Sequence, residues 1–394
     1  MKTHPGLIAG APFLAEPGLQ RILSLLNAEG EQARVVGGAV RNTLMGRAVS
    51  DIDIATTALP EAVMARAAAI GIHAVPTGVE HGTVTLVVGG VAYEVTTLRE
   101  DIDTDGRHAK VRFGRDFARD ALRRDFTINA LFADPLGNVF DYAGGLADLT
   151  ARRVRFIGDA DARIREDYLR ILRLFRFSAA YGDGTIDPEG LRAARRGMEG
   201  IERLSRERIR QETLKLLVQP NTTLVLAIMA REGFAAPILG GPVDLARLDR
   251  LVAIESTLAE QPDAIRRLFA LAVADPQDAH RLRERLRLSN AEADRLAAMT
   301  QAKAAGTTDR TLLYLLGPDA YRDRIIADWL ARAATADDPA RLAAYHLPEH
   351  WSAPRFPLSG ADLIASGWKP GPELGAELRR LEAEWIAAGM PPGD

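Results

Sequence analysis

The sequence predicts an α+β fold, with a small mixed head over residues 1–149 followed by a long remainder made of helices. Three observations predict it. Short apolar or alternating runs, which are typical of strands, occur in the head region and vanish after it. Beyond residue 150 the apolar residues recur with helical spacing instead. The chain of 394 residues is also longer than one hydrophobic core usually serves, which indicates several subdomains.

The composition is that of an ordinary globular protein, with 47% hydrophobic and 26% charged residues. Cysteine is absent, which excludes disulfides, a thiolate zinc site and a cysteine nucleophile. We find no N-terminal signal pattern and no apolar run of membrane-spanning length, so we expect a cytoplasmic protein with no membrane partner. The net charge is −3, yet residues 150–215 hold 16 Lys and Arg against 11 Asp and Glu. That excess fits an anion-binding surface and a solvated helical face equally well.

The head elements follow one another as strands and helices. ARVV at 33–36 and DIDI at 51–54 are predicted strands that flank an amphipathic helix. Alternating runs over 83–98 are joined by a Gly-Gly turn that needs positive φ, which predicts a hairpin. Residues 130–142 predict a second hairpin, with Pro, Gly and Asn in its turn. Helices beyond the head are predicted at 161–181, 202–218, 244–260, 263–273, 277–287, 289–302 and 373–388.

The segment VGGAVRNTLMGRAVSDID carries the most informative chemical pattern of the chain. Gly37 and Gly38 are expected to end a strand and begin a helix, in a turn that can cradle phosphates. Asp51 and Asp53 are two residues apart, so on a strand both carboxylates point to one side while Ile52 turns inward. Two hard oxygen ligands beside such a turn indicate Mg²⁺-dependent phosphoryl chemistry, with both aspartates as catalytic and metal-binding residues.

The strand that contains Glu94 is expected to pair beside the aspartate strand. Glu94 is therefore a third catalytic candidate, which could lie near the metal, orient the strand or assist deprotonation. An exposed strand glutamate without a catalytic role is equally consistent with the sequence.

Residues 123–131, RRDFTINAL, place two cations, an acid and an amide within two turns of chain. Arg124 could clamp a triphosphate, while Asp125 and Asn129 could hold ribose hydroxyls. In isolation, the simpler interpretation is an Asp125 helix cap beside a surface arginine pair. The following segment 141–149, DYAGGLADL, fits a flexible joint between head and helices as well as an ordinary turn.

An arginine ladder is predicted on the helix after the head. Asp167, Arg170, Arg173 and Arg176 recur every three residues, which places them on one helix face. The three arginines repel one another unless an anion lies beside them, and a triphosphate would serve. Glu212 and Lys215, also three apart, could brace this helix from the next one.

Asp167 and Arg170 permit a sharper hypothesis. Cytosine and adenine each present an amino donor beside a ring-nitrogen acceptor, whereas guanine and uracil present the reverse pattern. A carboxylate beside a guanidinium therefore matches C and A, and a good polar pair discriminates by ~1–3 kcal/mol. The simpler alternative is an exposed i,i+3 ion pair worth ~0.3–0.5 kcal/mol.

These motifs, in this order, resemble the class II tRNA nucleotidyltransferase family, which includes CCA-adding enzymes and bacterial poly(A) polymerases. The resemblance covers roughly residues 20–220 and is highly specific. Four family motifs have counterparts here: G-G-x-V-R-D at 37–42, R-R-D-x-x-x-N-A at 123–130, E-D-x-x-R at 166–170 and E-x-x-K at 212–215. The hinge of the family corresponds to residues 141–149. The segment 356–385 is similar to the tail of CCA-adding members.

The resemblance implies a polymerase-β-like head over 1–149, a neck over 150–220 that recognises the base, and a body and tail over 221–394 that bind tRNA. It also implies Mg²⁺ on the paired aspartates. Asn42 stands where the family usually has Asp, which keeps the hydrogen-bonding shape but loses a charge. The nucleotide-binding candidates are Gly37, Gly38, Arg41, Arg124, Asp125, Asn129, Asp167, Arg170, Arg173 and Arg176.

The implied reaction adds C, C and A to the tRNA 3′ end from CTP and ATP, with release of pyrophosphate. The expected partners are the tRNA acceptor arm, CTP and ATP, and the sequence indicates no oligomeric state. Alternatives are a poly(A) polymerase, a partial CC- or A-adding enzyme, and a catalytically silent RNA-binding protein. An aminoglycoside-type nucleotidyltransferase shares the Gly-Gly and Asp-x-Asp core but not the pair Asp167 and Arg170.

Overall fold

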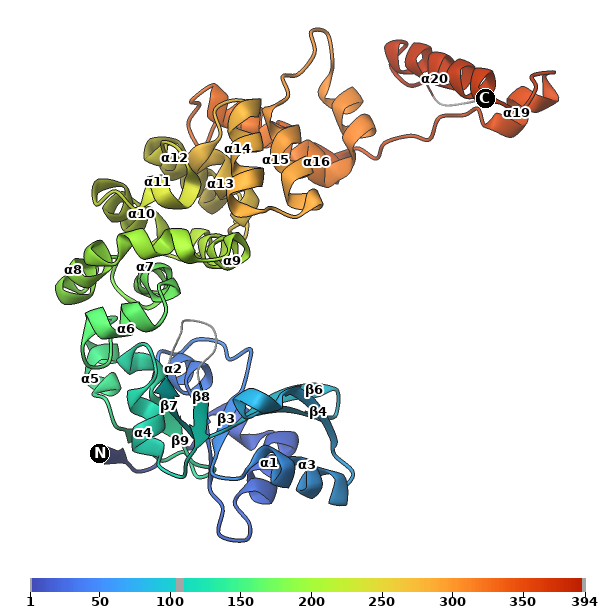
Figure 1. Cartoon of the computed structure of the whole chain (residues 1–394). Helices are drawn as coiled ribbons and strands as arrows, with labels where there is room; N and C mark the ends of the chain where they lie inside the picture. Colours follow the sequence, from blue (N-terminus) through green and yellow to red (C-terminus); the bar gives the residue numbers. More distant parts are fainter. Residues whose placement is uncertain (1, 104–109, 392–394) are drawn as a thin grey trace. The chain divides into compact units, whose positions relative to one another are not determined.

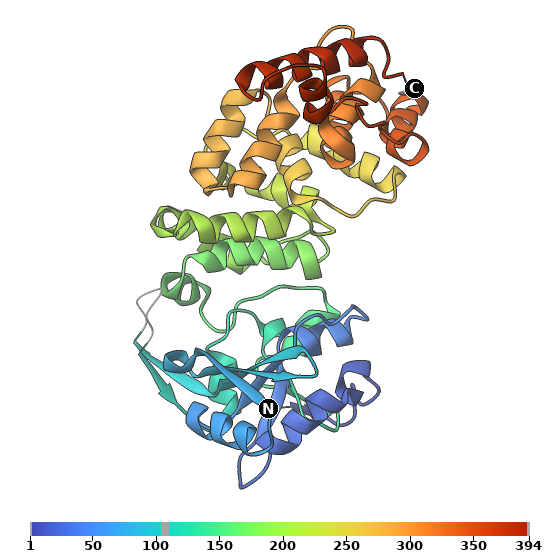
Figure 2. The same ribbon diagram turned by 90° about the vertical axis from the view of Figure 1, so that its right-hand side faces the viewer.

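The chain folds into two compact units, an N-terminal unit over Met1–Ile238 and a C-terminal unit over Leu239–Asp394 (Figure 1). The computed structural model describes residues 2–103 and 110–391, with side chains described over the same ranges apart from 100–103, 110 and 111. The fold class is the predicted one, since a mixed sheet with helices in the head gives way to helices (Figure 2).

The head is built on an eight-stranded mixed sheet. Adjacent strands are antiparallel except for the pair β3 and β6, which is parallel. A separate two-stranded ribbon joins β7 (Arg99–Asp103) to β8 (Lys110–Phe113). The order across the sheet is β1 (Lys2–His4), β10 (Val139–Asp141), β9 (Leu131–Ala133), β2 (Ala33–Val36), β3 (Asp53–Thr56), β6 (Val91–Thr97), β5 (Thr83–Val88) and β4 (His73–Gly78).

The strand predictions for the head are confirmed, with one difference. The strand at 33–36 and both hairpins form as predicted, and the two turn glycines, Gly89 and Gly90, have φ of 61° and 83°. The strand predicted at 51–54 begins only at Asp53, so Asp51 lies in the segment that leads into it. Ile52 is nevertheless 8% exposed and turned inward, as predicted.

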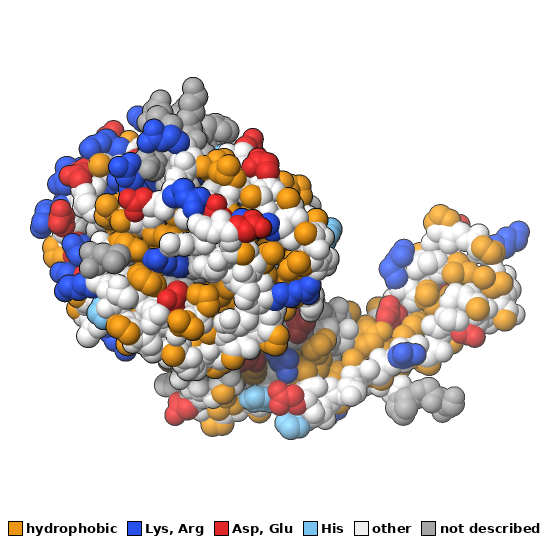
Figure 3. Space-filling model, turned by 90° about the horizontal axis from the view of Figure 1, so that it is seen from below, with side chains coloured by type: hydrophobic (Ala, Val, Ile, Leu, Met, Phe, Trp, Pro, Cys, Tyr) orange, Lys and Arg blue, Asp and Glu red, His pale blue; other side chains and the backbone are white. Residues whose placement is uncertain are grey.

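Apolar side chains cover both faces of this sheet. Helices α1 (Pro17–Leu26) and α3 (Pro60–Ala69) contact strands of the sheet and each other, and four apolar side chains of α1 are fully buried. Burial of one such side chain is worth ~1.5–3 kcal/mol. A second cluster joins Val36 and Phe132 to Phe117 of α4 (Phe117–Leu122). On the face drawn in Figure 3, Lys and Arg side chains lie among Asp, Glu and hydrophobic side chains rather than in one basic patch.

The register of three strands gathers the motif segments at one end of the sheet. Val36, the last residue of β2, pairs with Asp53 on one side and with Phe132 on the other. Because both neighbours run antiparallel to β2, the beginnings of β3 and β9 lie beside the end of β2. Gly37, Asp53 and the segment before β9 therefore meet at the same edge.

Helices make up the rest of the N-terminal unit, and the helix predicted at 161–181 is wrong as a single element. It is interrupted at Asp167, whose φ of −158° and ψ of 108° are those of extended chain. Helical periodicity continues across the break because only two residues separate the two helices. The helices are α2 (Gly38–Leu44), α5 (Gly145–Thr150), α6 (Ala160–Glu166), α7 (Leu169–Tyr181), α8 (Pro188–Arg196), α9 (Arg206–Leu217), α10 (Thr222–Arg231) and the start of α11 (Ala235–Leu239).

The C-terminal unit is made of helices over the residues that the structure describes. Its longest helix, α16 (Asp309–Ala331), contains a kink at Gly317, with φ of 73°, followed by Pro318. None of the described helices combines the length and the apolar character that crossing a membrane requires. The other helices are α12 (Leu245–Thr257), α13 (Ala264–Ala272), α14 (Pro276–Leu286), α15 (Asn290–Thr300), α17 (Pro339–Tyr345), α18 (Leu347–His350), α19 (Gly360–Ala365) and α20 (Pro372–Ala387).

Candidate active site

Three carboxylates gather at the end of the head sheet. Asp53 and Glu94 are register partners on the parallel strands β3 and β6, as the sequence predicts, and both are exposed. Partial burial raises the pKa of Asp53, Glu94 and Asp51 raise it further, and Arg124 opposes them. Asp51 accepts a hydrogen bond from Ser50 Oγ at 3.0 Å. These negative groups therefore repel one another.

The carboxylate oxygens of Asp51 and Asp53 are a donor set that fits a divalent cation. Within residues 2–103 and 110–391, no three Asp, Glu or His side chains converge closely enough to hold a metal by themselves. A cation between Asp51 and Asp53 would offset the repulsion that raises the pKa of Asp53. Both residues supply hard oxygen ligands, and the exposed position leaves room for ligands from a substrate.

The glycine turn lies against two of the predicted cations. Gly37 has φ of 71° and ψ of −114°, a conformation that side chains rarely adopt, and it precedes α2. A Cβ on Gly37 would lie 3.9 Å from Arg124 Nη1, and one on Gly38 would lie 3.9 Å from Arg41 Nη2. The turn thus brings backbone and guanidinium groups together.

Arg124 is held by a buried acid that sequence reasoning missed. Asp120 is 1% exposed, and its two oxygens accept from Arg123 Nε at 2.8 Å and Arg124 Nη2 at 3.0 Å. Burial would raise the pKa of Asp120, but Arg124 and Arg123 outweigh it and hold the pKa below its usual range. The predicted surface arginine pair is therefore wrong, because both guanidiniums are anchored to Asp120.

A buried polar chain links the head to the neck helix α7. Arg41, 6% exposed, donates to Asn129 Oδ1, and Asn129 Nδ2 donates to Asp125 Oδ1 at 3.0 Å. Asp125 Oδ2 accepts from Arg173 Nη2 at 2.5 Å. Burial opposes ionisation of Asp125, yet Arg173 and Asn129 hold its pKa below the usual range. Asp125 is thus an interior link, not the predicted alternative of a helix cap.

Tyr181 completes the surroundings of Arg41. Its hydroxyl accepts from Arg41 Nη2 at 2.6 Å, and its ring lies 3.8 Å below the guanidinium carbon. Asn42 Oδ1 accepts from the same guanidinium at 3.0 Å, while Asn42 Nδ2 donates to the carbonyl of Ala48 at 3.0 Å. A carboxylate at this position could not donate, so Asn42 has a structural use that the family Asp lacks.

The arginine ladder is offset by acids of the protein. Arg173 Nη1 lies 3.8 Å from Glu212 Oε1, and Arg176 Nε lies 2.6 Å from Glu212 Oε2. Glu212 on α9 is 7% exposed and braces α7, as the sequence predicts. The inference that these arginines need a triphosphate to offset their repulsion is therefore wrong, because Asp125 and Glu212 already do so. A role on the triphosphate stays a prediction.

Asp167 and Arg170 do not bond to each other through their side chains. Asp167 Oδ1 accepts from the N–H of Leu169 at 3.0 Å, and its Oδ2 accepts from Arg208 Nη2 at 2.6 Å. Arg170 Nη1 donates to Glu166 Oε2 at 2.5 Å and to the carbonyl of Arg163 at 3.0 Å. The simpler alternative, an i,i+3 ion pair between Asp167 and Arg170, is therefore wrong. The prediction that Asp167 shares a helix face with the arginines is also wrong, because Asp167 precedes α7.

The glycine segment at 141–149 is closely packed in this structure. Asp141 accepts from four successive N–H groups at 2.8–3.1 Å, those of residues 143–146. A Cβ on Gly145 would lie 2.3 Å from the carbonyl oxygen of Thr127. The segment is an ordered start to α5, and bending at this point stays a prediction.

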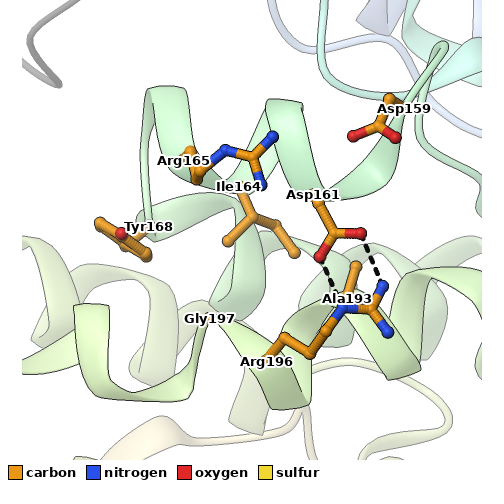
Figure 4. A pocket seen from close by; sticks show the side chains of 8 residues that line it. All are labelled: Asp159, Asp161, Ile164, Arg165, Tyr168, Ala193, Arg196 and Gly197. Carbon is orange, nitrogen blue, oxygen red and sulfur yellow. Dashed lines mark hydrogen bonds and ion pairs between the residues drawn. The ribbon is translucent and has the colours of Figure 1, made fainter.

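A pocket of about 500 Å³ lies between α6 and α8 (Figure 4). Arg196 and Asp161 form a bidentate ion pair across it, with contacts of 2.8 and 2.6 Å. None of the predicted site residues lines this pocket, so it is separate from the polar groups described above.

Sequence spacing predicts some of the residues that bind the candidate site residues, but not others. Glu166 lies four residues before Arg170, a spacing that indicates side-chain contact. Arg208 lies 41 residues after its partner, and Tyr181 lies 140 residues after Arg41. Sequence spacing alone carries no signal for these long-range pairs.

The chain matches known proteins along most of its length. Residues 33–155 match a poly A polymerase head domain, and residues 185–243 match a probable RNA and SrmB-binding site of polymerase A. The chain is 35% identical over 390 residues to the human mitochondrial CCA tRNA nucleotidyltransferase 1, covering 94% of this chain and 87% of that protein. It is 32% identical over 378 residues to a CCA-adding enzyme of Levilactobacillus brevis, covering 94% and 93%.

A solved structure is similar as well. The crystal structure of the Bacillus stearothermophilus CCA-adding enzyme in complex with CTP superposes with a TM-score of 0.74 at 28% identity, covering 95% of this chain and 94% of that chain.

Proposed function

The chain belongs to the CCA-adding tRNA nucleotidyltransferase family, and we propose that it adds C, C and A to the 3′ end of tRNA from CTP and ATP. The observation that carries the proposal is the meeting of Gly37, Asp53 and Arg124 at one end of the head sheet, in the same unit as Asp167 and Arg170. The first group suits phosphoryl transfer and the second suits base recognition.

In the proposed reaction the 3′-hydroxyl oxygen of the tRNA attacks the α-phosphorus of the nucleotide. A new P–O bond forms, the bond between the α- and β-phosphates breaks, and pyrophosphate leaves. Glu94, one strand from Asp53, is the candidate group to accept the hydroxyl proton or to orient the aspartate strand. Arg124, which Asp120 holds, and Arg41 are proposed to contact the phosphates, and the closeness of both guanidiniums to the glycine turn supports this.

We propose Mg²⁺ as the cofactor, held by Asp51 and Asp53. When bound, it would lower the pKa of the attacking hydroxyl and offset charge that develops on the phosphate. Burial is the largest cause of the raised pKa of Asp53, and repulsion from Glu94 and Asp51 adds to it. A cation there would relieve the repulsion, which supports this assignment.

The neck is proposed to choose the nucleotide. Asp167 would accept from the amino group of cytosine or adenine, and Arg170 would donate to the neighbouring ring nitrogen. Arg173 and Arg176 are proposed to contact the triphosphate, and Asp125 and Asn129 to hold the ribose side of the site. Uracil and guanine would present an acceptor to Asp167 and a donor to Arg170, and such a mismatch is costly.

The three-part division also stands as a proposal. The head (1–149) would carry the chemistry, the neck (150–220) the base recognition, and the body and tail (221–394) the tRNA contacts. These contacts would recognise shape and phosphates rather than sequence. A cytoplasmic location is likewise proposed, and fractionation of the source cells would test it.

Extension of tRNA is the direct test. Purified chain with Mg²⁺ is incubated with tRNA that ends at its discriminator base, using CTP alone, ATP alone and both, and the 3′ ends are sequenced. We expect CC with CTP and CCA with both nucleotides. Long A tails from ATP alone would indicate a poly(A) polymerase, addition that stops at CC or adds only A would indicate a partial enzyme, and no extension would contradict the proposal.

A further inference from the structure

Asp167 is held rigidly although it lies outside a helix. It occupies the break between α6 and α7, where extended backbone turns its side chain toward α9. Its two oxygens have separate protein donors, the N–H of Leu169 for Oδ1 and the guanidinium of Arg208 for Oδ2, at 3.0 and 2.6 Å. Neither the position nor the angle of the carboxylate can change without the loss of one of these bonds.

The break itself is packed from the other side. Tyr168, the next residue, lies against Gly200, where an added Cβ would be 2.0 Å from the tyrosine ring. The ring of Tyr168 also faces Arg203 at 5.7 Å. The backbone at Asp167 is therefore constrained by packing, and its side chain by Arg208.

The bound carboxylate keeps capacity for a further donor. An ionised carboxylate offers about four acceptor positions, of which the two protein bonds use two. The Asp167 side chain is 23% exposed and that of Arg208 is 28% exposed, so solvent and a ligand can approach the pair. A third donor, such as the exocyclic amino group of a base, can thus be accepted while Arg208 stays in place.

We infer that Arg208 is a specificity-determining positioning residue, which fixes the Asp167 carboxylate so that it accepts from the amino group of cytosine and adenine. The inference rests on the proposed role of Asp167 in base recognition. Without Arg208 the carboxylate could rotate about its side-chain bonds, and the angular selection of a donor would weaken. Arg170 has an equivalent support in Glu166, which holds one of its nitrogens.

An ordinary ion pair that only ties α9 to the break would give a different result on substitution. It would change stability or the overall rate for all nucleotides alike. A positioning role changes the ratio between nucleotides, because only the geometry of one acceptor is altered. The ratio of CTP to UTP incorporation therefore separates the two roles.

The test measures addition of the first nucleotide to tRNA that ends at its discriminator base, with CTP and UTP in separate reactions of the full chain. For Arg208→Gln we expect the ratio of kcat/KM for CTP over UTP to fall about tenfold, mainly through a higher KM for CTP. Arg208→Lys should retain part of the preference, because a single charge replaces the planar fork. The matched control is Arg206→Gln on the same helix. Arg206 forms an ion pair with Glu202 at 2.6 Å, and its substitution should leave the CTP to UTP ratio unchanged.

Asp167→Ala distinguishes failure of this inference from failure of the proposed function. If Asp167→Ala loses the preference for CTP while Arg208→Gln keeps it, the positioning role of Arg208 is overturned and the base-reading role of Asp167 stands. If Asp167→Ala also keeps the preference, both are overturned. Circular dichroism checks folding, and Arg208→Lys carries the test if Arg208→Gln does not fold.

Discussion

The carboxylates at the end of the head sheet and those in the interior of the C-terminal unit have opposite surroundings. Asp53 faces Glu94 and Asp51, and its pKa is raised by partial burial and by these acids. In the C-terminal unit, Asp323 is 3% exposed and accepts from Arg266 Nε at 2.7 Å and from Arg295 Nε at 2.5 Å.

The same unit holds a second acid in this cluster. Arg295 Nη1 donates to Asp263 at 2.8 Å, and although burial opposes it, backbone N–H groups and Arg295 hold the pKa of Asp263 below its usual range. Acids that stabilise the fold are thus surrounded by donors, whereas those at the sheet end are left short of positive charge. This shortage of positive charge indicates where a bound cation and a substrate would interact with the carboxylates.

The largest expected effect is on catalysis. Asp53→Asn should lower nucleotide incorporation by at least about 10³-fold, ~4 kcal/mol of barrier, because the charge that would hold the cation is removed. Single-turnover incorporation into tRNA with saturating Mg²⁺ measures it. Glu80→Gln, an exposed head carboxylate away from this end of the sheet, is the control and should keep wild-type rates. Near wild-type activity in Asp53→Asn would contradict the catalytic assignment.

The next effect is on stability. Asp323→Ala leaves the buried Arg266 guanidinium without its acid and removes one of the two acids that Arg295 binds, which should cost ~3–5 kcal/mol of unfolding free energy. Urea unfolding followed by circular dichroism measures the loss. The ion pair between Arg332 and Asp328 is the comparison, because the Arg332 side chain is 61% exposed. Arg332→Ala should therefore change the unfolding free energy by less than ~1 kcal/mol. Equal losses in the two variants would contradict the structural role given to the buried cluster.

Acid should weaken the N-terminal unit through Asp120. Its folded pKa is lowered, so its stabilisation is present above the ordinary aspartate pKa of ~3.9 and is lost as the pH falls through the lower folded value. Asp120→Asn should therefore cost ~1–3 kcal/mol at pH 7 and reduce the loss of stability as the pH falls below the ordinary aspartate pKa of ~3.9. Urea unfolding at several pH values measures both. An unchanged acid dependence would show that other groups control it.

The smallest expected effect has the opposite sign. Because the folded pKa of Asp53 is raised, its ionised form destabilises the folded state above that pKa, and the penalty disappears as the pH falls. In Mg²⁺-free buffer at pH 7, Asp53→Asn should raise the unfolding free energy by less than ~1 kcal/mol, since solvent screens an exposed carboxylate. Thermal unfolding with and without Mg²⁺ tests it, and only the wild type should gain stability from the metal. A clear destabilisation in Asp53→Asn would contradict this account.

The sequence predicts local features well and distant partners poorly. The hairpin at 83–98 follows from alternation and turn chemistry, which are local. The pairing of Asp53 with Glu94 was expected too, although it joins strands that are distant in the chain. The helix break at Asp167 escapes prediction, because the apolar period runs through it and its extended backbone is fixed by contacts with α9. Helices α8, α10 and α16 were likewise not predicted.

The candidate site shows the same division. The pattern of glycines, aspartates and arginines identifies which residues to consider, and the register of β2, β3 and β9 gathers those of the head. The partners that hold the arginine ladder, Asp125 and Glu212, lie 48 and 36 residues from the arginines they bind. Spacing alone could not assign these ion pairs, since each depends on how α7 packs.

The most direct test of the central claim, that neck side chains choose the nucleotide while head carboxylates do the chemistry, is the base selectivity of Arg170→Ala. CTP and UTP compete for the first addition to tRNA ending at its discriminator base, and the products are sequenced. We expect about a tenfold rise in the UTP fraction relative to wild type, with incorporation still dependent on Asp53. An unchanged ratio of CTP to UTP would contradict it.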